Sequence, residues 1–494
     1  MAGPLRKKRK AATEGFSTAR LPDQLSDDEI SDVSDTPRKA PPAPAPPSAA
    51  AEPPMAVPSV QGFARWNLER CPEVLEAIRE NGRKWARPLR VFSMYTGWGT
   101  AEMVTHAVGR ELQRLGIDME FEVAWICESN REKCKYLASA FQDVGYIFTD
   151  ASEVADGYAH DYRTGQKFLV PTDLDLGFVG YPCVDLSSLN VGQGQFMDTS
   201  TATGKGYANM LKLVDRCDDH LLFLGVENSG NMWRKRKQDA FRRPIEIQDA
   251  AFRQRGFATA SHRVSSYEFG PPQSRQRSWS LYFKSRSADG NASRTFLSFK
   301  CNVMPISQIL AEGHKTDRSW PMRPKGGTKW MGQFEQLSSC LDQARLQRKI
   351  SEVVTRKLPL TSRELHVVAL AAYQLEGRGV DLEKNTVVIQ VDQNFGRSHR
   401  ADARVAPCII PKGKYVVTGS HWRLLGTREK CFLQGVGPAE IEGYGMEKWL
   451  SPVQLSDMAG NAFTAQICLA AFLTALAVVD PPWGAIEDPE ISNI

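Results

Sequence analysis

The residues best suited to chemistry are a thiol, a carboxyl and a pair of guanidinium groups, each next to a separate apolar run. Cys183 lies in GYPCVDLSS after the run LDLGFVG, and Glu227 comes near the end of the run LLFLGVEN. Arg275 and Arg277 stand two positions apart in GPPQSRQR, before a third run. A thiolate is a nucleophile, a carboxyl can donate a proton, and guanidinium groups stabilise negative charge. Taken singly, each residue is more often structural, but on neighbouring strands they would face one pocket.

A second group of residues suits a nucleoside ligand. Tyr95, Gly97 and Gly99 lie in YTGWGT, where a strand gives way to a helix. A lone G-x-G predicts only a tight turn, and Glu102 stands where the dinucleotide fingerprint has its third glycine.

Two acidic residues end the next two predicted strands. Glu128 is placed to accept hydrogen bonds from ribose hydroxyls, and Asp150 could hold an adenine amino group. A glycine loop without its third glycine, followed by these carboxylates, fits a nucleoside cofactor that lacks a pyrophosphate. S-adenosylmethionine therefore fits better than NAD.

Strands that alternate with helices position all of these residues. This pattern predicts an α/β fold with a doubly wound, mostly parallel sheet, whose sites lie at the carboxyl ends of its strands. A helix over 66–80 leads into it. The predicted strands cover residues 89–97, 121–128, 146–150, 174–180, 221–228, 257–266 and 275–283.

The alternation stops after Phe283, where a second, smaller lobe rich in Arg and Lys is expected. It contains a helix-like segment over 340–356 and short β-like runs at 386–391 and 415–419. A capped, largely apolar helix over 455–479 must dock on an existing core, and that of the first domain is expected to receive it. The expected domains are a disordered tail (1–60), a catalytic α/β domain (61–283), a target-recognition lobe (284–440), a terminal helix that returns to the catalytic domain (441–480) and a C-terminal tail (481–494).

The composition is that of a soluble globular protein, with 494 residues, 42% hydrophobic and 24% charged. Its net charge of +5 permits a polyanionic partner without requiring one. The longest apolar run, 464–479, is shorter than the ~20 residues of a membrane span. Ten cysteines without a C-x-x-C pair or a Cys/His cluster indicate free thiols in a reducing compartment, without a metal site.

The first 60 residues are too poor in large apolar side chains to fold alone. The run RKKRK at 6–10 is a candidate for nuclear import or nucleic-acid contact, and otherwise a solvated charge cluster. An acidic stretch at 26–35 contains Ser26, Ser31 and Ser34, which are possible phosphorylation sites.

Several blocks occur in one order along the chain: F-x-x-x-T-G-x-G, Glu128, Asp150, G-x-P-C, E-N, P-Q-x-R-x-R, L-Q-G and G-N-A. In this order they resemble the cytosine-C5 DNA methyltransferase family. The resemblance covers roughly residues 88–480, apart from most of the stretch 284–400. The joint match is specific, whereas no single block is.

The resemblance implies a reaction and a set of residues for it. Cys183 would add to C6 of a cytosine flipped out of double-stranded DNA, and Glu227 would donate a proton or hydrogen bond at N3. Arg277, with Arg275 in support, would stabilise the ring carbonyl and position the Cys183 loop. No side chain is an evident base for removal of the C5 proton. The residues that would bind S-adenosylmethionine are Tyr95, Gly97, Gly99, Glu128, Asp150, Pro182, Asn461 and Ala462.

The chain departs from the family pattern at three positions. Val184 stands where the family usually has Gln, which puts in doubt how the gap left by the flipped base is filled. Tyr181 replaces a usual Pro, and Ser229 a usual Val.

Two alternatives stay open beside a nuclear DNA methyltransferase. The first is the same chemistry on RNA, although the Cys-Phe-Thr mark of the tRNA-modifying branch is missing, since Cys431-Phe432 runs into Leu433. The second is a catalytically silent chromatin adaptor that meets its partners through the tail.

Overall fold

The computed structural model describes residues 59–186, 194–217, 220–284, 289–311, 330–392, 395 and 401–479. All of these belong to one compact unit, Glu52–Ile494. The basic run at 6–10, the three serines and the C-terminal tail lie outside the described residues.

A seven-stranded sheet forms the centre of the fold, in the order β3-β2-β1-β6-β7-β10-β8. β10 is antiparallel to both of its neighbours, and the remaining pairs are parallel. The strand order changes direction between β1 and β6, where α/β sheets place their ligand sites. This confirms the predicted α/β class with a mostly parallel, doubly wound sheet. The strands are β1 Leu89–Met94, β2 Phe121–Cys127, β3 Tyr146–Phe148, β6 Leu176–Val179, β7 Phe223–Ser229, β8 Ala258–Ser265 and β10 Gln276–Phe283.

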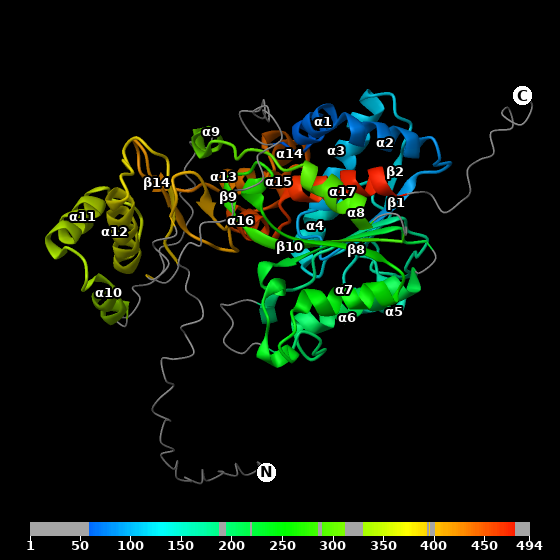
Figure 1. The fold of residues 1–494 in the computed structure, drawn as a ribbon, viewed down its shortest axis with the longest axis horizontal. Helices are drawn as coiled ribbons and strands as arrows, with labels where there is room; N and C mark the ends of the chain where they lie inside the picture. Colours follow the sequence, from blue (N-terminus) through cyan, green and yellow to red (C-terminus); the bar gives the residue numbers. More distant parts are fainter. Residues whose placement is uncertain are drawn as a thin grey trace, which may run out of the picture. The chain divides into compact units, whose positions relative to one another are not determined.

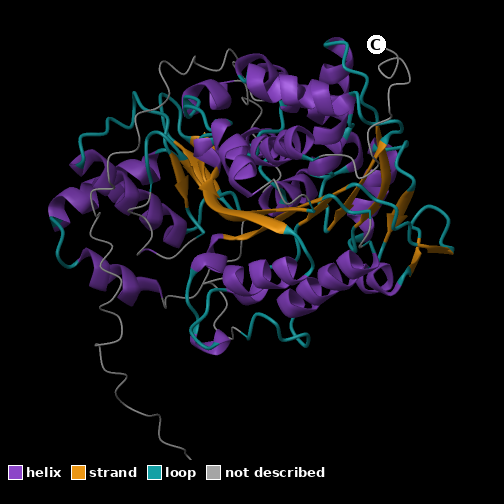
Figure 2. Ribbon diagram, turned by 45° about the vertical axis from the view of Figure 1, so that its right-hand side comes forward, coloured by secondary structure: helices purple, strands orange, loops and turns teal. Residues whose placement is uncertain are grey.

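Helices cover both faces of the sheet (Figures 1 and 2). On β1, Val91 belongs to one hydrophobic core, whereas Phe92 and Met94 belong to the other. Each face therefore has its own apolar layer. One layer contains α1 Val60–Arg70, α2 Pro72–Gly82, α3 Thr100–Arg114, α4 Arg131–Ala140 and α8 Asp289–Ser298, and the other contains α5 Ala151–Asp156, α6 Ala202–Arg216 and α7 Pro244–Gln254.

The single lead-in helix predicted over 66–80 is wrong, because the structure has two helices there, α1 and α2. The chain leaves helical geometry at Cys71, where ψ is 70°, and Pro72 begins the second helix. Proline suits the first position of a helix, since its missing N–H would be unpaired there in any case.

The single helix predicted over 455–479 is also two helices, α16 (Pro452–Asn461) and α17 (Ala465–Val478), bent by 48°. Ala462 between them is extended, with ψ of 159°. Nearly all of α17 is buried, and it packs against α2, α3 and α8. Among the described residues, no single helix is long and apolar enough to cross a membrane. The bent pair α16 and α17 meets the length and composition requirements only when the two helices are taken together.

The segment after β10 contains more helix than the sequence predicts. α12, Ser362–Gly377, is missing from the prediction because its apolar residues (VVALAA) form a run without helical spacing. Two small cores of its own hold part of this segment, including α11 (Gln343–Thr355) and α12. In contrast, α8, α9 (Ile306–Ala311) and α13 (Thr427–Leu433) contribute residues to the core of the first layer. The predicted domain boundaries stay predictions. The remaining elements here are α10 Trp330–Ser338, β11 Val388–Gln390, β12 Ala406–Pro407, β13 Tyr415–Val417 and β14 Arg423–Leu424.

Candidate active site

The Cys183 loop leaves the carboxyl end of β6, at the switch point of the sheet. Gly180 begins the loop against the ring of Phe463, since a Cβ on Gly180 would lie 2.4 Å from Phe463 Cε1. Gly206 lets α6 approach the loop closely as well, because a Cβ there would lie 2.9 Å from Pro182 Cδ. The loop is therefore held by α6 on one side and by the segment before α17 on the other.

The residues after Cys183 form a short 3-10 helix, η2 (Val184–Leu186). The buried carboxylate of Asp185 accepts a hydrogen bond from Thr203 N at 3.0 Å, and Thr203 Oγ1 accepts one from Asp185 N at 3.1 Å. These two bonds fix η2 to the start of α6. The side chain of Val184 is 54% exposed, so an apolar group is presented to solvent next to the thiol.

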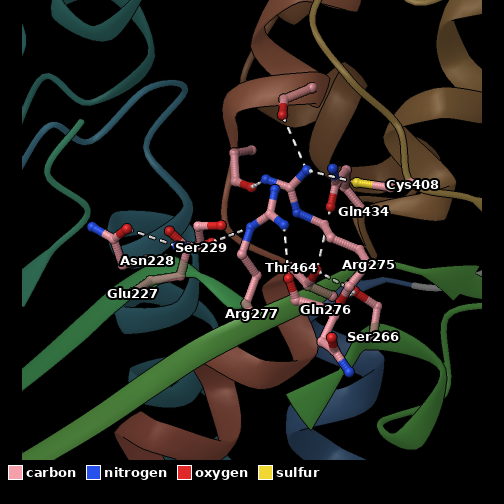
Figure 3. A network of polar contacts seen from close by, with 12 residues as sticks. Glu227, Asn228, Ser229, Ser266, Arg275, Gln276, Arg277, Cys408, Gln434 and Thr464 are labelled. Atoms are coloured by element: carbon pink, nitrogen blue, oxygen red, sulfur yellow. Dashed lines mark hydrogen bonds and ion pairs between the residues drawn. The ribbon is translucent and has the colours of Figure 1, made fainter. Parts of the chain in front are cut away.

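Glu227 and Arg277 meet across neighbouring strands, β7 and β10 (Figure 3). In the antiparallel register, Glu227 lies opposite Trp279, two positions from Arg277. Arg277 Nε lies 2.9 Å from Glu227 Oε1. The carboxyl and one of the guanidinium groups that the sequence singles out therefore form an ion pair.

The charges at this site are linked to the thiol. Burial raises the pKa of Cys183 above its ordinary value, Arg277 and Arg275 act to lower it, and Glu227 adds to the rise. Burial works against the charge on Arg277, but Cys408, Glu227 and Cys183 outweigh it and raise the pKa of that guanidinium. The thiol, the carboxylate and the guanidinium thus act on one another.

Arg275 has different partners from Arg277. Its guanidinium is buried and donates to three backbone carbonyls: Ile409 O at 3.0 Å, Gly460 O at 3.1 Å and Ala462 O at 2.8 Å. These carbonyls belong to segments 134 to 187 residues further along the chain. Arg275 therefore connects the strand of Arg277 to the turn between α16 and α17.

Two glutamines make further connections that sequence reasoning missed. Gln273 donates to Leu433 O at 2.6 Å and accepts from Ile409 N at 2.8 Å. Gln434 donates to Ala459 O at 2.6 Å. Both lie inside quoted motifs, P-Q-x-R-x-R and L-Q-G, so their position was visible in the sequence but their role was not.

A second thiol, Cys408, also lies in this cluster (Figure 3). Its sulfur is 3.7 Å from Arg275 Nη1. Nothing in the sequence around Cys408 distinguishes it from the other nine cysteines. All ten are free, and in the described ranges no group of His, Cys, Asp or Glu side chains is placed to hold a metal ion.

The glycine loop after β1 has three residues in the left-handed region: Tyr95 with φ of 59°, Gly97 with φ of 65° and Gly99 with φ of 83°. For a tyrosine this conformation is unfavourable by about 1–2 kcal/mol. The backbone N–H of Tyr95 donates to Cys127 O at 2.8 Å, which ties the loop to the end of β2.

The carboxylate of Glu128 is fixed by this loop. It accepts from Gly97 N at 3.1 Å through one oxygen and from Asn130 N at 2.9 Å through the other. Lys133 Nζ lies 4.0 Å away. Glu128 is thus buried and oriented at the strand end where the sequence placed it.

The two glycines of the loop differ in the space next to them. A Cβ on Gly97 would meet no heavy atom within 4 Å, whereas one on Gly99 would lie 2.4 Å from Phe141 Cε2. An open backbone beside an oriented carboxylate suits the ribose and the methionine part of S-adenosylmethionine, so the residues present fit that cofactor.

Glu102, which breaks the dinucleotide fingerprint, has a structural place beneath the loop. It is buried and accepts hydrogen bonds from Ser93 Oγ and from Thr96 Oγ1, the latter at 2.8 Å. Burial raises the pKa of this carboxyl. Glu102 therefore links β1, the glycine loop and α3 without reaching the open side of the loop.

The side chains of Asp150 and Asn461, both predicted to bind the cofactor, make hydrogen bonds within their own helices. The Asp150 carboxylate caps α5 by accepting from Ser152 N at 2.6 Å. The Asn461 amide donates to Asp457 O at 3.1 Å, within α16. The structure thus brings Gly97 and Glu128 into direct contact, whereas the side chains of Asp150 and Asn461 are exposed and engaged by their own helices.

Comparison with known proteins gives the family of the chain. The chain is 24% identical to the DNA (cytosine-5-)-methyltransferase DMT5 of Cryptococcus neoformans var. grubii over 437 residues, which is 83% of this chain but only 18% of that protein. Among solved structures, the S. pombe Dnmt2 methyltransferase is similar at 12% identity with a TM-score of 0.42, over 79% of this chain and 98% of that one. The profile of C-5 cytosine-specific DNA methylases matches residues 89–471. The chain belongs to the C-5 cytosine-specific DNA methylase family.

Proposed function

We propose that this protein transfers a methyl group from S-adenosylmethionine to C5 of cytosine in double-stranded DNA, through a covalent bond between Cys183 and C6. The observation that carries the proposal is the ion pair of Glu227 and Arg277, which lies beside the Cys183 loop and acts on the charge of its thiol. Addition to a cytosine ring requires a nucleophile, a proton donor and a cation, and Cys183, Glu227 and Arg277 supply these in that order.

The reaction begins when Cys183 gives up its proton to solvent and its sulfur adds to C6. Glu227, carrying a proton in the closed site, donates to ring N3 as the sulfur adds, which draws electrons away from C6 and leaves an enamine whose C5 is nucleophilic. Arg277 stabilises the negative charge that develops on the ring carbonyl. Because Arg277 and Glu227 are paired, a ring that contacts one of them also meets the other.

The cofactor supplies an electrophilic methyl group, which C5 of the activated ring takes up. Glu128 would hold the ribose hydroxyls, and the open backbone at Gly97 would accept the rest of the molecule. Arg275 holds the Gly460–Ala462 turn in place through its carbonyls. The C5 proton then leaves to solvent, the electrons of the broken C–H bond expel the Cys183 sulfur, and N3 returns its proton to Glu227, which restores the aromatic ring and the free enzyme.

DNA is favoured over RNA as the substrate by the family profile and by the position of Cys431 and Phe432. Both side chains are buried in helix α13 and are followed by Leu433. They therefore do not form the Cys-Phe-Thr tripeptide of the tRNA-modifying branch. We further propose a nuclear location, which the RKKRK run supports, and chromatin partners that bind the tail.

The test is methyl transfer from labelled S-adenosylmethionine to unmethylated duplex DNA, hemimethylated duplex DNA or tRNA. We expect label in a DNA duplex. Label in tRNA alone would overturn the choice of DNA, and label in no substrate would overturn the enzymatic proposal and favour an adaptor.

A second experiment tests the covalent step. The parent protein should form a stable adduct with a duplex that contains 5-fluorocytosine, because fluorine cannot leave as the C5 proton does. Cys183→Ser should form none, while Cys408→Ser, which removes the other thiol of the arginine cluster, should still form it. An adduct that persists in Cys183→Ser would show that another residue is the nucleophile.

A further inference from the structure

A strongly basic segment follows the strand that carries Glu227. Residues 230–243, here called the basic loop, have the sequence GNMWRKRKQDAFRR, and six of the eleven positions from Trp233 to Arg243 are Arg or Lys. The described part of the loop contains two 3-10 turns, η3 (Gly230–Trp233) and η4 (Lys237–Asp239). None of these cations has a part in the methylation chemistry.

The six cations fall into two groups. Arg236 is buried and lies 3.4 Å from Asp239, and Arg243 lies 3.5 Å from Glu246. The other four are exposed, and no ion pair joins any of them to a carboxylate of the described residues. These four are Arg234, Lys235, Lys237 and Arg242. The loop therefore presents a concentrated, uncompensated positive charge, whereas charged surfaces are usually interspersed with acids.

The basic loop is bonded to the chain on both sides of the 187–193 stretch that follows Cys183 and η2. Asn231 donates to Leu186 O at 2.7 Å, before that stretch. After it, Arg236 donates to Gly194 O at 2.5 Å, and Asp239 accepts from Phe196 N at 2.7 Å. The basic loop therefore lies next to the described residues on either side of that stretch, near the Cys183 loop.

The tip of the basic loop is apolar and held in an unfavourable conformation. Ala240 and Phe241 both have positive φ, 53° and 59°. Phe241 is 67% exposed, directly before the exposed Arg242 and in the same loop as the other exposed cations. An aromatic ring among cations is the combination that contacts sugars and bases beside phosphates.

We propose that the basic loop binds the phosphate backbone of duplex DNA next to the target cytosine, with Phe241 contacting a sugar or base edge. This inference rests on the proposed function and deepens it by assigning a DNA-binding surface outside the second lobe. Duplex DNA carries about one negative charge per 1.7 Å of its axis. A short, dense cluster of cations therefore fits duplex DNA better than it fits an acidic protein, whose negative charges are more widely spaced.

The chain offers a matched control for the test. Arg234-Lys235 is an exposed Arg-Lys pair in the basic loop, and Arg83-Lys84 is another exposed Arg-Lys pair, between α2 and β1. The basic loop follows the carboxyl end of β7, whereas Arg83-Lys84 precedes the amino end of β1. Since these strands run in the same direction, the two pairs lie at opposite edges of the sheet.

The experiment measures binding of the 494-residue chain to a fluorescent duplex at several salt concentrations, and the KM for the same duplex. For Arg234→Gln/Lys235→Gln we expect about tenfold weaker binding, a correspondingly higher KM and a salt slope smaller by about 2, one unit per lost phosphate contact. Arg83→Gln/Lys84→Gln should behave as the parent protein. Phe241→Ala should weaken binding without changing the slope, because it removes no charge. Binding of S-adenosylmethionine, unchanged in all three, reports correct folding.

Unchanged affinity and slope in Arg234→Gln/Lys235→Gln would overturn the inference, as would a parent protein that binds no duplex. Loss of nuclear accumulation with unchanged DNA affinity would assign the loop to transport and also overturn it. If the protein methylates no substrate but its DNA binding depends on the basic loop, the proposed function is wrong and this inference stands. If it methylates DNA but its binding does not depend on the basic loop, this inference is wrong and the proposed function stands.

Discussion

Arg277 Nε lies 2.9 Å from Glu227 Oε1, with the two side chains on adjacent strands of opposite direction. Each side chain neutralises the charge of the other. Two residues that act as a unit give non-additive losses when they are removed.

The first prediction concerns this pair. Glu227→Gln and Arg277→Gln should each lower kcat by about 10²–10³, the usual loss for one group that stabilises a transition-state charge. The double variant should be little worse than the poorer single variant. Single-turnover methylation of duplex DNA measures all three rates. The control is Arg255→Gln, which removes a remote pairing with Asp215 and should leave the rate unchanged. Losses that simply multiply in the double variant would show that the pair does not act together.

The second prediction concerns the ionisation of Cys183. Burial raises its thiol pKa above the ordinary value of 9.0, and Arg277 opposes this rise. Because the thiolate is the reactive form, alkylation of Cys183 by iodoacetamide should increase with pH through a midpoint above that value. Arg277→Gln should move the midpoint further up, since it removes the opposing charge. Mass spectrometry of the Cys183 peptide gives the rates, and the exposed Cys340 serves as an internal reference for the reagent. A midpoint below the ordinary value would contradict the assignment of burial as the dominant cause.

The sequence predicted those parts of the site that depend on strand order. Glu128 and Glu227 come from strand ends, and the alternation of strands and helices is enough to bring such ends to one edge of a sheet. The partners of Arg275 could not be predicted, because they are backbone carbonyls from distant segments, and a carbonyl leaves no mark in the sequence. The break at Ala462 was missed because the largely apolar composition of 455–479 predicts one helix, although Gly460-Asn461, residues that commonly end a helix, stand directly before it.

The third prediction follows from the three carbonyls held by Arg275. Arg275→Lys keeps the charge but replaces a planar fork with one ammonium group, which cannot reach all three acceptors. A buried carbonyl left without a donor costs about 1–3 kcal/mol, so urea unfolding should show a loss of that size or larger. The KM for S-adenosylmethionine should rise as well, because the turn at Gly460–Ala462 loses its support. Arg263→Lys, at an exposed position of the same sheet, is the control. A stability loss without any change in this KM would make Arg275 a purely structural residue.

The fourth prediction concerns acid stability and involves Glu111. Burial works to raise its pKa, but hydrogen bonds from Arg65, Gln61 and Arg114 outweigh it and lower the pKa to about 2. A depressed pKa in the folded state stabilises the protein above the ordinary value of 4.5, and this contribution is lost as the pH falls toward 2. The free energy of unfolding of Glu111→Gln should therefore be lower than that of the parent protein at pH 7. The two should converge as the pH falls from 4.5 toward 2, measured by urea titration. A constant difference across this range would contradict the assignment.

The last prediction separates the two glycines of the loop after β1. Both are left-handed, so alanine at either position costs about 1–2 kcal/mol in backbone energy. At Gly99 the new Cβ would also lie 2.4 Å from Phe141 Cε2, so Gly99→Ala should lose about 1–3 kcal/mol more through overpacking. At Gly97 it would enter open space beside Glu128. Gly97→Ala should therefore remain folded and lose affinity for S-adenosylhomocysteine, measured by calorimetry, while thermal unfolding shows the larger loss of stability in Gly99→Ala. Unchanged affinity in Gly97→Ala would show that the cofactor does not occupy the space next to that glycine, and would move the cofactor site away from the loop.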